Sequence, residues 1–173
     1  MTVDGTDFRI CEQTPFSSSW FSHKFKGPAY RYEIALAIQS DRICWTNGPY
    51  RAGAWPDMKI FRRGGLMKKL PQGERVEADK GYRGEKLKID LLHECTGGDP
   101  LQRRSKARVR ARHESMNRML KRFKCLHEVY CHDLVKHQTV FCAVVYVTQI
   151  ALQNGSSLMK VNYKTMELKR SGV

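Results

Sequence analysis

The sequence is poor in acidic residues and in long apolar runs. Among its 173 residues, 17 Asp and Glu stand against 31 Lys and Arg, and the net charge is +14. This imbalance predicts a polyanionic partner, with DNA or RNA as the default candidate and a merely soluble basic protein as the alternative. The longest apolar run, Val140 to Leu152, is interrupted by polar residues and is far shorter than the roughly 20 residues of a membrane span. We therefore expect a buried helix there and no contact with a membrane.

Paired cysteine motifs and a signal peptide are also lacking. The six cysteines are scattered without a Cys-x-x-Cys pair, and Met1 to Asp4 has neither a charged nor an apolar leader region. We therefore expect reduced thiols in an intracellular protein. A zinc site would fit no standard finger spacing, so packed thiols and surface histidines are the favoured interpretation. The residues considered for zinc are His93, Cys95, Cys125, His127, Cys131 and His132.

Turn residues divide the chain into alternating strand-like and helix-like segments. A length of 173 residues fits one domain with its own core. Residues 1–12 begin in strand-like fashion, and Arg75 to Ala78 form a short strand. Tyr32 to Gln39 and Asp41 to Thr46 are predicted to pair as a hairpin, and Asn47 to Tyr50 to end it with a turn. These strands predict a mixed sheet that opens with an antiparallel meander.

Three helices are predicted after the hairpin. They run from Asp57 to Leu70, from about Leu101 or Ser105 to Lys124, and from about His132 to Gln153. Asp57 is interpreted first as the N-cap of the first helix and second as a site residue. The segment 81–101 is the least regular part, with a break at 97–100. We assign residues 1–153 to one α/β domain and expect the polar tail 154–173 to be loosely held.

One acidic residue lies in a strongly basic segment. From Arg103 to Lys124 there are ten Lys and Arg residues and a single carboxylate, Glu114. On a helix, one largely apolar stripe would contain Val109, His113, Met116, Leu120 and Phe123, and the adjacent stripe Arg110, Glu114, Arg118 and Lys121. Glu114 is thus predicted at the border of the buried face, where its side chain reaches over the edge of a sheet. The alternative is an intrahelical ion pair with Arg110 or Arg118, worth about 0.3–0.5 kcal/mol.

Two aspartates follow strand-like residues upstream of this helix. They are Asp4, in Thr2-Val3-Asp4-Gly5-Thr6, and Asp79, in Val76-Glu77-Ala78-Asp79-Lys80-Gly81-Tyr82. Phosphodiester cleavage by two divalent ions about 3.5–4 Å apart needs carboxylates on rigid neighbouring elements. Two strand aspartates and a helix glutamate beside cationic surface therefore suggest a metal-dependent enzyme acting on nucleic acid. Either aspartate alone is more simply explained as an ordinary strand-end or turn residue.

Further motifs accompany these acids. They are Lys24-Phe25-Lys26-Gly27, Trp55-Pro56-Asp57-Met58-Lys59-Ile60-Phe61 and Arg110-x-x-x-Glu114-x6-Lys121. Taken together, in this order and spacing, the motifs resemble the catalytic domain of DDE transposases of the Harbinger type over roughly residues 3 to 126. The last string is similar to a signature in bacterial relatives of an arginine, a catalytic glutamate and a lysine on one helix face. The tyrosine that those relatives carry three positions before the arginine is absent, and Ala107 stands there.

This resemblance implies an RNase H-like fold and the activity of a DNA endonuclease or transposase. Asp4, Asp79 and Glu114 would be the catalytic, metal-binding triad, with Mg²⁺ as the cofactor and Mn²⁺ as a substitute. Arg110 and Lys121 would contact DNA phosphate near the cleavage site, and Arg118 on the same stripe would also bind DNA. The alternatives are a decayed or co-opted relative that binds DNA or a protein without cutting, and an RNase H-like ribonuclease that prefers an RNA–DNA hybrid.

Full-length relatives carry an N-terminal DNA-binding region, whereas this chain begins almost at Asp4. We therefore expect a shortened first strand, a mobile Asp4, and a DNA-binding region that is either lost or supplied by a separate protein partner. Eukaryotic relatives work in the nucleus, so a nuclear location is expected. The oligomeric state is left open by the sequence.

Overall fold

A six-stranded mixed sheet forms the centre of the molecule. The computed structural model describes residues 1–92 and 100–161, and the statements below concern these residues. The strands are β1 (Thr2–Arg9), β2 (Phe21–Ser22), β3 (Gly27–Leu36), β4 (Ile43–Arg51), β5 (Val76–Ala78) and β6 (Ile89–Leu91). Their order is β4-β3-β1-β5-β6, with the short β2 also paired to β3. The β1, β3 and β4 strands form the predicted antiparallel meander, and β5 and β6 extend the sheet by parallel pairing.

The first strand is long and paired on both sides. It is antiparallel to β3 from Thr2, opposite Leu36, to Arg9, opposite Ala29. On its other side it is parallel to β5. The prediction of a shortened strand with a poorly anchored Asp4 was therefore wrong. It counted only the residues before Asp4, whereas the strand gains its length from the residues that follow.

The β4 strand runs through the segment that was predicted to be a turn. Tyr50 and Arg51 pair with β3, so Asn47 to Tyr50 do not end the hairpin. The register shifts between the pairs of Arg31 and Glu33, where two residues of β4, Gly48 and Pro49, lie opposite the single residue Tyr32 of β3. A proline without an N–H donor is tolerated at such an irregularity, which explains why turn-like residues occur within a strand.

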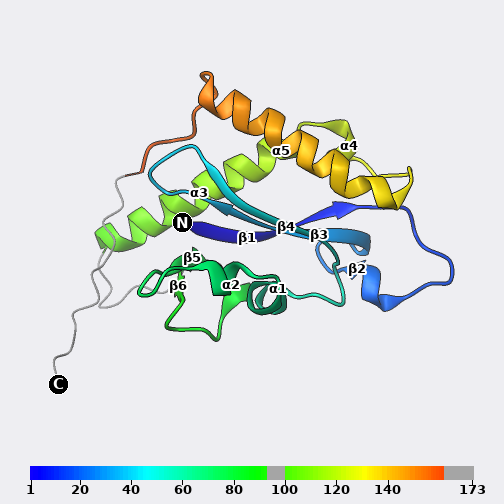
Figure 1. Cartoon of the computed structure of the whole chain (residues 1–173), viewed down its shortest axis with the longest axis horizontal. Helices are drawn as coiled ribbons and strands as arrows, with labels where there is room; N and C mark the ends of the chain where they lie inside the picture. The colour runs from blue at the N-terminus through cyan, green and yellow to red at the C-terminus, as the bar shows by residue number, and fades with distance from the viewer. Residues whose placement is uncertain (93–99, 162–173) are drawn as a thin grey trace.

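Helices cover both faces of the sheet (Figure 1). One face carries α1 (Asp57–Arg63) and α2 (Leu66–Lys69), and the other carries α3 (Pro100–Leu120) and α5 (His137–Gln153), with the short α4 (Lys124–His127) between them. Three 3-10 helices connect these elements, namely η1 (Ser18–Trp20), η2 (Lys80–Tyr82) and η4 (Leu134–Lys136). The single helix predicted from Asp57 to Leu70 is broken at Gly65, whose φ of 106° is left-handed. The predicted helix to Lys124 ends at Leu120, and the last helix begins at His137 rather than His132.

Two apolar clusters hold the layers together. Alternating residues of β3 divide between them, since Ile34 faces α3 and α5 whereas Ala35 faces α1 and α2. The first cluster joins Phe8, Ile34 and Leu36 to Met116, Leu120 and Phe141. The second joins Val3, Ala35 and Val76 to Phe61, Leu66 and Tyr82. The strands of the central sheet are therefore buried on both sides, which fixes the ends of β1 and β5 relative to α3.

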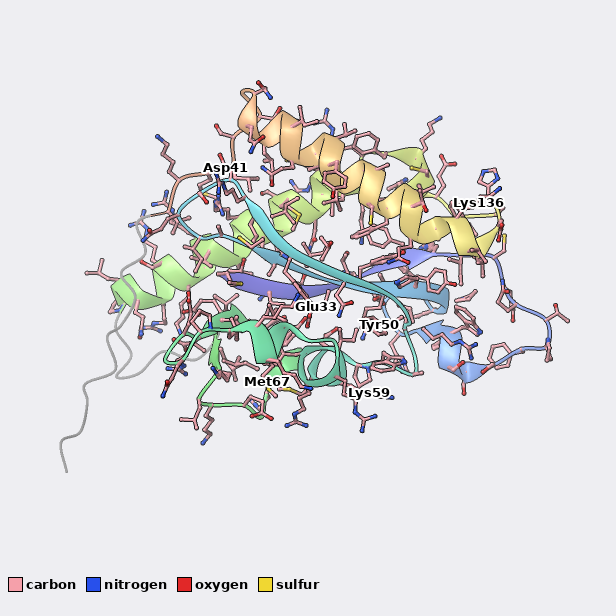
Figure 2. The ribbon with its side chains drawn as sticks, in the orientation of Figure 1. Glu33, Asp41, Tyr50, Lys59, Met67 and Lys136 are labelled. Atoms are coloured by element: carbon pink, nitrogen blue, oxygen red, sulfur yellow. The ribbon has the colours of Figure 1, made fainter. Side chains whose placement is uncertain are left out.

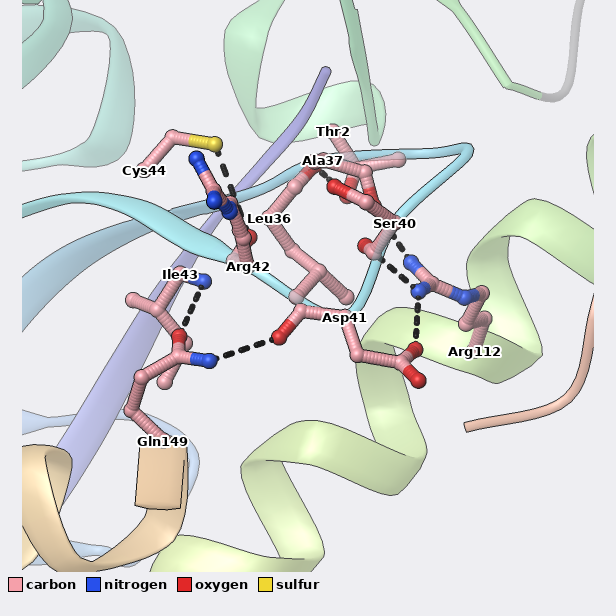
Figure 3. Close-up of polar contacts among 10 residues, drawn as sticks. All are labelled: Thr2, Leu36, Ala37, Ser40, Asp41, Arg42, Ile43, Cys44, Arg112 and Gln149. Atoms are coloured by element: carbon pink, nitrogen blue, oxygen red, sulfur yellow. Dashed lines mark hydrogen bonds and ion pairs between the residues drawn. The ribbon is translucent and has the colours of Figure 1, made fainter. Parts of the chain in front are cut away.

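Arg112 of α3 clamps the turn between β3 and β4 (Figure 3). Its guanidinium donates hydrogen bonds to the carbonyl oxygens of Ala37 and Ser40, and Nη2 lies 2.6 Å from Asp41 Oδ1. Gln149 of α5 reaches the same turn and donates to the Asp41 carbonyl at 2.8 Å. Arg112 is buried, so this member of the basic segment stabilises the fold and does not face solvent.

Lys106 is a second buried cation of the same helix. Its ammonium lies 2.7 Å from Asp90 Oδ1 and donates to the Leu91 carbonyl at 3.0 Å. The Asp90 and Leu91 partners belong to β6, a strand that the sequence did not predict within the segment 81–101. Buried ion pairs of this kind fix the position of a helix against a sheet edge.

The topology confirms the predicted α/β class and is compatible with an RNase H-like sheet flanked by helices. Of the predicted loose tail, Leu158 is buried and packs with the core of the α3–α5 face, and residues 162–173 lie outside the described part. The predicted break at 97–100 lies outside it as well, apart from Pro100, which begins α3. None of the described helices has the length and apolar character that a bilayer span requires.

Candidate active site

Asp4 in β1 and Asp79, the residue that follows β5, lie at corresponding positions of two neighbouring chain segments. The parallel pairing of β1 with β5 aligns Val3 with Ala78, and each aspartate is the next residue along its segment. Paired strands are about 4.8 Å apart, so this register places the two residues near each other where β5 ends. Both residues line a cavity of about 610 Å³.

The cavity lies between the sheet and α3 and has a strongly basic wall. Glu114 and Asn117 of α3 line it together with Asp4 and Asp79. The cationic residues of the lining are Lys24, Arg110, Arg118, Lys121 and Arg122. The tertiary structure thus brings all three predicted triad residues and all three predicted DNA-binding residues to one cavity. A wall of this charge attracts phosphate groups.

The carboxylate of Asp4 is held by α3. Asn117 Nδ2 donates a hydrogen bond to Asp4 Oδ2 at 2.9 Å. Burial raises the pKa of Asp4 to about 6, and the negative charge of Asp57 adds to that rise. Lys24, the Gly5 amide and the Asn117 side chain oppose it without cancelling it. Burial therefore disfavours the ionised form of Asp4 more than the neighbouring positive charge and hydrogen bonds stabilise it.

Glu114 is engaged by an arginine of its own helix. Arg110 Nε lies 3.0 Å from Glu114 Oε1, one helical turn away, and both side chains are more than half exposed. The same guanidinium approaches Asp79, with Nη2 at 4.0 Å from Oδ2. The intrahelical ion pair considered as an alternative is thus present, but the arginine also connects Glu114 with Asp79. Arg110 supplies positive charge between these two acids.

The oxygen donors at the cavity are compatible with a hard divalent cation. Mg²⁺ takes carboxylate and carbonyl oxygens, which Asp4, Asp79 and Asn117 provide. A bound cation would stabilise the ionised form of Asp4, whose pKa is raised by burial and by Asp57. In residues 1–92 and 100–161, no three His, Cys, Asp or Glu side chains already form a group that could hold a metal ion. The described residues that were considered for a zinc site, Cys125, His127, Cys131 and His132, therefore do not form such a group either. The other two, His93 and Cys95, lie outside the described part.

The predicted DNA-binding residues differ in their accessibility. Arg110 and Arg118 are exposed, as a phosphate contact requires. Lys121 is half-buried beside the rings of Phe8 and Phe25, with Nζ at 5.3 and 5.4 Å from the ring centroids. Burial lowers the pKa of Lys121 to about 8, with Lys24 as a further cause. Lys121 is therefore a cation of the cavity wall, and the helix ends one residue before it.

Two residues of the cavity were not assigned a role from the sequence. Asn117 contacts Asp4 directly, and Lys24 lies close enough to lower the pKa of that acid. Asn117 follows Glu114 by three positions on a helix, and this spacing was a signal that it shares the same face. Lys24 lies in the loop between β2 and β3, and no periodicity of the sequence connects it to the aspartates.

Asp57 is not the N-cap of α1. Pro56 holds that position without a side-chain hydrogen bond, and Asp57 is the first residue of the helix. Its Oδ1 lies 3.3 Å from Arg31 Nη1. Burial raises the pKa of Asp57, to which Asp7 and Asp79 contribute, while Arg31 opposes the rise. The cap prediction was wrong because the helix begins one residue earlier than expected and the side chain turns toward the sheet.

Comparison with protein-family models gives a match over most of the chain. A protein-family model described as DDE superfamily endonuclease matches residues 3–154. No curated protein and no solved structure matches the chain. The matched segment runs from Val3 in β1 to the residue after α5 and contains Asp4, Asp79 and Glu114.

Proposed function

Because the chain belongs to the DDE superfamily endonuclease family, we propose that it is a metal-dependent DNA endonuclease of the transposase class. Asp4, Asp79 and Glu114 would bind two divalent ions, Mg²⁺ or in its place Mn²⁺. The ions would activate the attacking hydroxyl group and stabilise the leaving oxygen of the phosphodiester. The Harbinger type is the member of this class that the sequence motifs favour.

One observation carries this proposal. The register of β1 and β5 aligns the two aspartates at the wall of a basic cavity that Glu114 also lines. Ordinary strand-end aspartates would need no such cavity, and an ordinary helix ion pair would not reach Asp79. The structure is therefore better explained by a site for phosphate chemistry than by three unrelated acids.

The residues that line the cavity would have different roles in the reaction. Asn117 orients the Asp4 carboxylate through the 2.9 Å hydrogen bond. Arg110, whose guanidinium lies 3.0 Å from Glu114 and 4.0 Å from Asp79, would bind a DNA phosphate beside these two acids. Arg118 and Lys121 would hold the strand along the cavity wall. The nucleus would be the place of action.

The test is the nicking of supercoiled plasmid in Mg²⁺ and in Mn²⁺. The wild-type protein is expected to nick the plasmid, and Asp79→Asn and Glu114→Gln are expected to reduce nicking by at least about 100-fold. Glu128→Gln is the matched control, because Glu128 is exposed and is not among the described residues that line the cavity. It should nick like the wild type.

The same assay decides between the proposal and its alternatives. A wild-type protein that binds the plasmid but never nicks it would contradict the enzyme and favour a DNA-binding remnant. Cleavage of an RNA–DNA hybrid in preference to duplex DNA would favour the ribonuclease. Equal loss of nicking in Glu128→Gln would show that the assay reports protein stability and not the triad.

A further inference from the structure

The carboxylate of Asp57 fills the space beside two glycines that follow the predicted metal-binding aspartates. A Cβ atom at Gly5 would collide with Asp57 Oδ1, and a Cβ atom at Gly81 would stand 2.6 Å from Oδ2. Real Cβ atoms essentially never approach another heavy atom so closely. Each carboxylate oxygen therefore lies in the volume that a side chain at one of these positions would require.

The backbone conformation does not explain these two glycines. The described glycines with left-handed φ values are Gly48, Gly65, Gly73, Gly84 and Gly155. Gly5 lies within β1 and Gly81 within η2, and neither is among them. An alanine would be allowed at both positions by its backbone angles. The close approach of Asp57 is what excludes it.

A charged network fixes the Asp57 carboxylate. Arg31 Nη1 lies 3.3 Å from Asp57 Oδ1. The same guanidinium makes a two-point contact with buried Asp7, with Nε at 2.6 Å from Oδ1 and Nη2 at 3.0 Å from Oδ2. Ser22 donates a further hydrogen bond to Asp7 at 2.6 Å. The two-point contact with Asp7 leaves Arg31 little freedom, so the ion pair with Arg31 restrains Asp57, and we expect a side chain at position 5 or 81 to be destabilising.

We propose that Asp57 is a positioning residue that sets the spacing between Asp4 and Asp79. It contacts β1 one residue after Asp4 and η2 two residues after Asp79, so one carboxylate holds both acid-bearing segments. Side chains alternate along β1, and Asp57 therefore supports the segments from the face opposite the Asp4 side chain. Asp57 is not among the described residues that line the cavity. The consequence for catalysis rests on the proposed function, whereas the contact itself does not.

A double-mutant cycle on the whole 173-residue chain, purified without added metal, tests the contact. Gly81→Ala in the wild-type background is expected to lower Tm by about 3–8 °C, because the new Cβ meets the fixed carboxylate. In an Asp57→Ala background the same substitution should cost little, because the space is then free. Gly5→Ala should behave in the same way. If Asp57→Ala does not fold, Asp57→Ser, with its shorter side chain, takes its place in the cycle.

Gly27→Ala is the matched control for the cycle. Gly27 also lies in a strand, and a Cβ there would meet no atom closer than 4.0 Å. Its effect should be small and equal in both backgrounds. An equal loss of Tm for Gly81→Ala with and without Asp57 would overturn the proposal, because the carboxylate would then not be what excludes a side chain.

Mn²⁺ binding, followed by the electron paramagnetic resonance of the free ion, tests the consequence. Asp57→Asn keeps the size of the side chain but weakens its attachment to Arg31, and it is expected to lower Mn²⁺ affinity about ten-fold or more with unchanged stoichiometry. Glu85→Gln, which breaks the surface pair of Glu85 with Arg62, should leave the affinity unchanged. Unchanged affinity in Asp57→Asn would overturn the positioning role. If the wild type binds no Mn²⁺, the proposed function fails. The melting temperatures of the double-mutant cycle then show by themselves whether the Asp57 contact is real.

Discussion

Glu33 is a fully buried acid on the α1–α2 face of β3 (Figure 2). Trp45 Nε1 donates a hydrogen bond to Glu33 Oε2 at 3.1 Å, and Oε1 has no partner among the described residues. Burial raises the pKa of Glu33 to about 7, with Asp57 as a further cause, while the indole contact opposes the rise. An uncharged residue would thus suit this position at neutral pH.

The sign of the pH dependence follows from that raised pKa. The folded protein binds the Glu33 proton more tightly than the unfolded chain, so its contribution to stability is fully present below about pH 4.5 and is lost as the pH rises through about 7. Glu33→Gln should remove this loss and gain on the order of 2 kcal/mol relative to the wild type between pH 5 and pH 8. Urea unfolding of both proteins across this range measures it. A stability difference that does not change with pH would contradict the prediction.

Asn117 is expected to act through Asp4. Asn117→Ala removes the hydrogen bond to a carboxylate, a contact worth about 1.5–3 kcal/mol, and should reduce plasmid nicking by about ten-fold or more. Ser115→Ala is a suitable control, since Ser115 lies on the same helix and its hydroxyl donates to the Ala111 carbonyl of that helix at 2.9 Å. Equal nicking by both variants would show that Asn117 does not orient Asp4.

At the scale of elements, the end of β1 is joined to the loop that precedes α5. Ile10 forms a parallel bridge with Tyr130, and the Cys11 amide donates to the Tyr130 carbonyl at 3.1 Å. This pairing brings the free thiols of Cys11 and Cys131 to 2.8 Å from each other. Cys44 and Cys125 are also exposed, but neither has a cysteine partner among the described residues.

Mild oxidation with diamide should therefore join Cys11 and Cys131. Each thiol gives up one proton and one electron, the S–S bond forms, and diamide is reduced to its hydrazine form. Closing a loop of 120 residues should raise the free energy of unfolding by about 3–5 kcal/mol. Peptide mapping by mass spectrometry and urea unfolding measure the two effects. Cys131→Ser should abolish both and Cys44→Ser neither, and a disulfide that involves Cys125 would contradict the prediction.

Helix α3 shows how an element can be predicted correctly and its surface only in part. Val109, His113, Met116 and Leu120 are buried as the apolar stripe predicted. The sequence did not predict that two of the basic residues, Lys106 and Arg112, are buried. Their partners come from β6 and from the β3–β4 turn, and no local pattern in the helix specifies partners that distant.

At the scale of the whole molecule, the net charge of +14 does not say which face meets DNA. The cavity side carries Arg110, Arg118 and Arg122, and the opposite layer carries exposed cations such as Lys68 of α2. A phosphate contact contributes about 0.9 to the slope of log affinity against log salt concentration. The two faces can therefore be distinguished by single substitutions.

Arg118→Ala should weaken DNA binding and reduce the salt slope by about one, whereas Lys68→Ala should change neither. Fluorescence anisotropy of a labelled duplex at several salt concentrations measures both quantities. Equal effects of the two substitutions would mean that the net positive charge of the whole protein attracts DNA without a preferred face. The cavity side would then not be the DNA-binding face.

The sequence by itself determined the mixed α/β class, the apolar stripe of α3 and the set of acids at the cavity. Each of these depends on local order, because side-chain periodicity and motif spacing are properties of adjacent residues. The sequence also placed Glu114 at the border of the buried stripe, and this is where the exposed side chain lies.

Only the tertiary structure decided how the acids are held. The parallel register of β1 and β5 aligns Asp4 with Asp79 and brings both segments close to the Asp57 side chain. The packing of α3 against the sheet places Asn117 in hydrogen-bond contact with Asp4 and places Arg110 between Asp79 and Glu114. The length of β1 and the strand character of Asn47 to Tyr50 were likewise decided by pairing with β3. Contacts between segments more than 70 residues apart leave no periodic trace in one sequence, because many partners of similar chemistry would satisfy each side chain equally well.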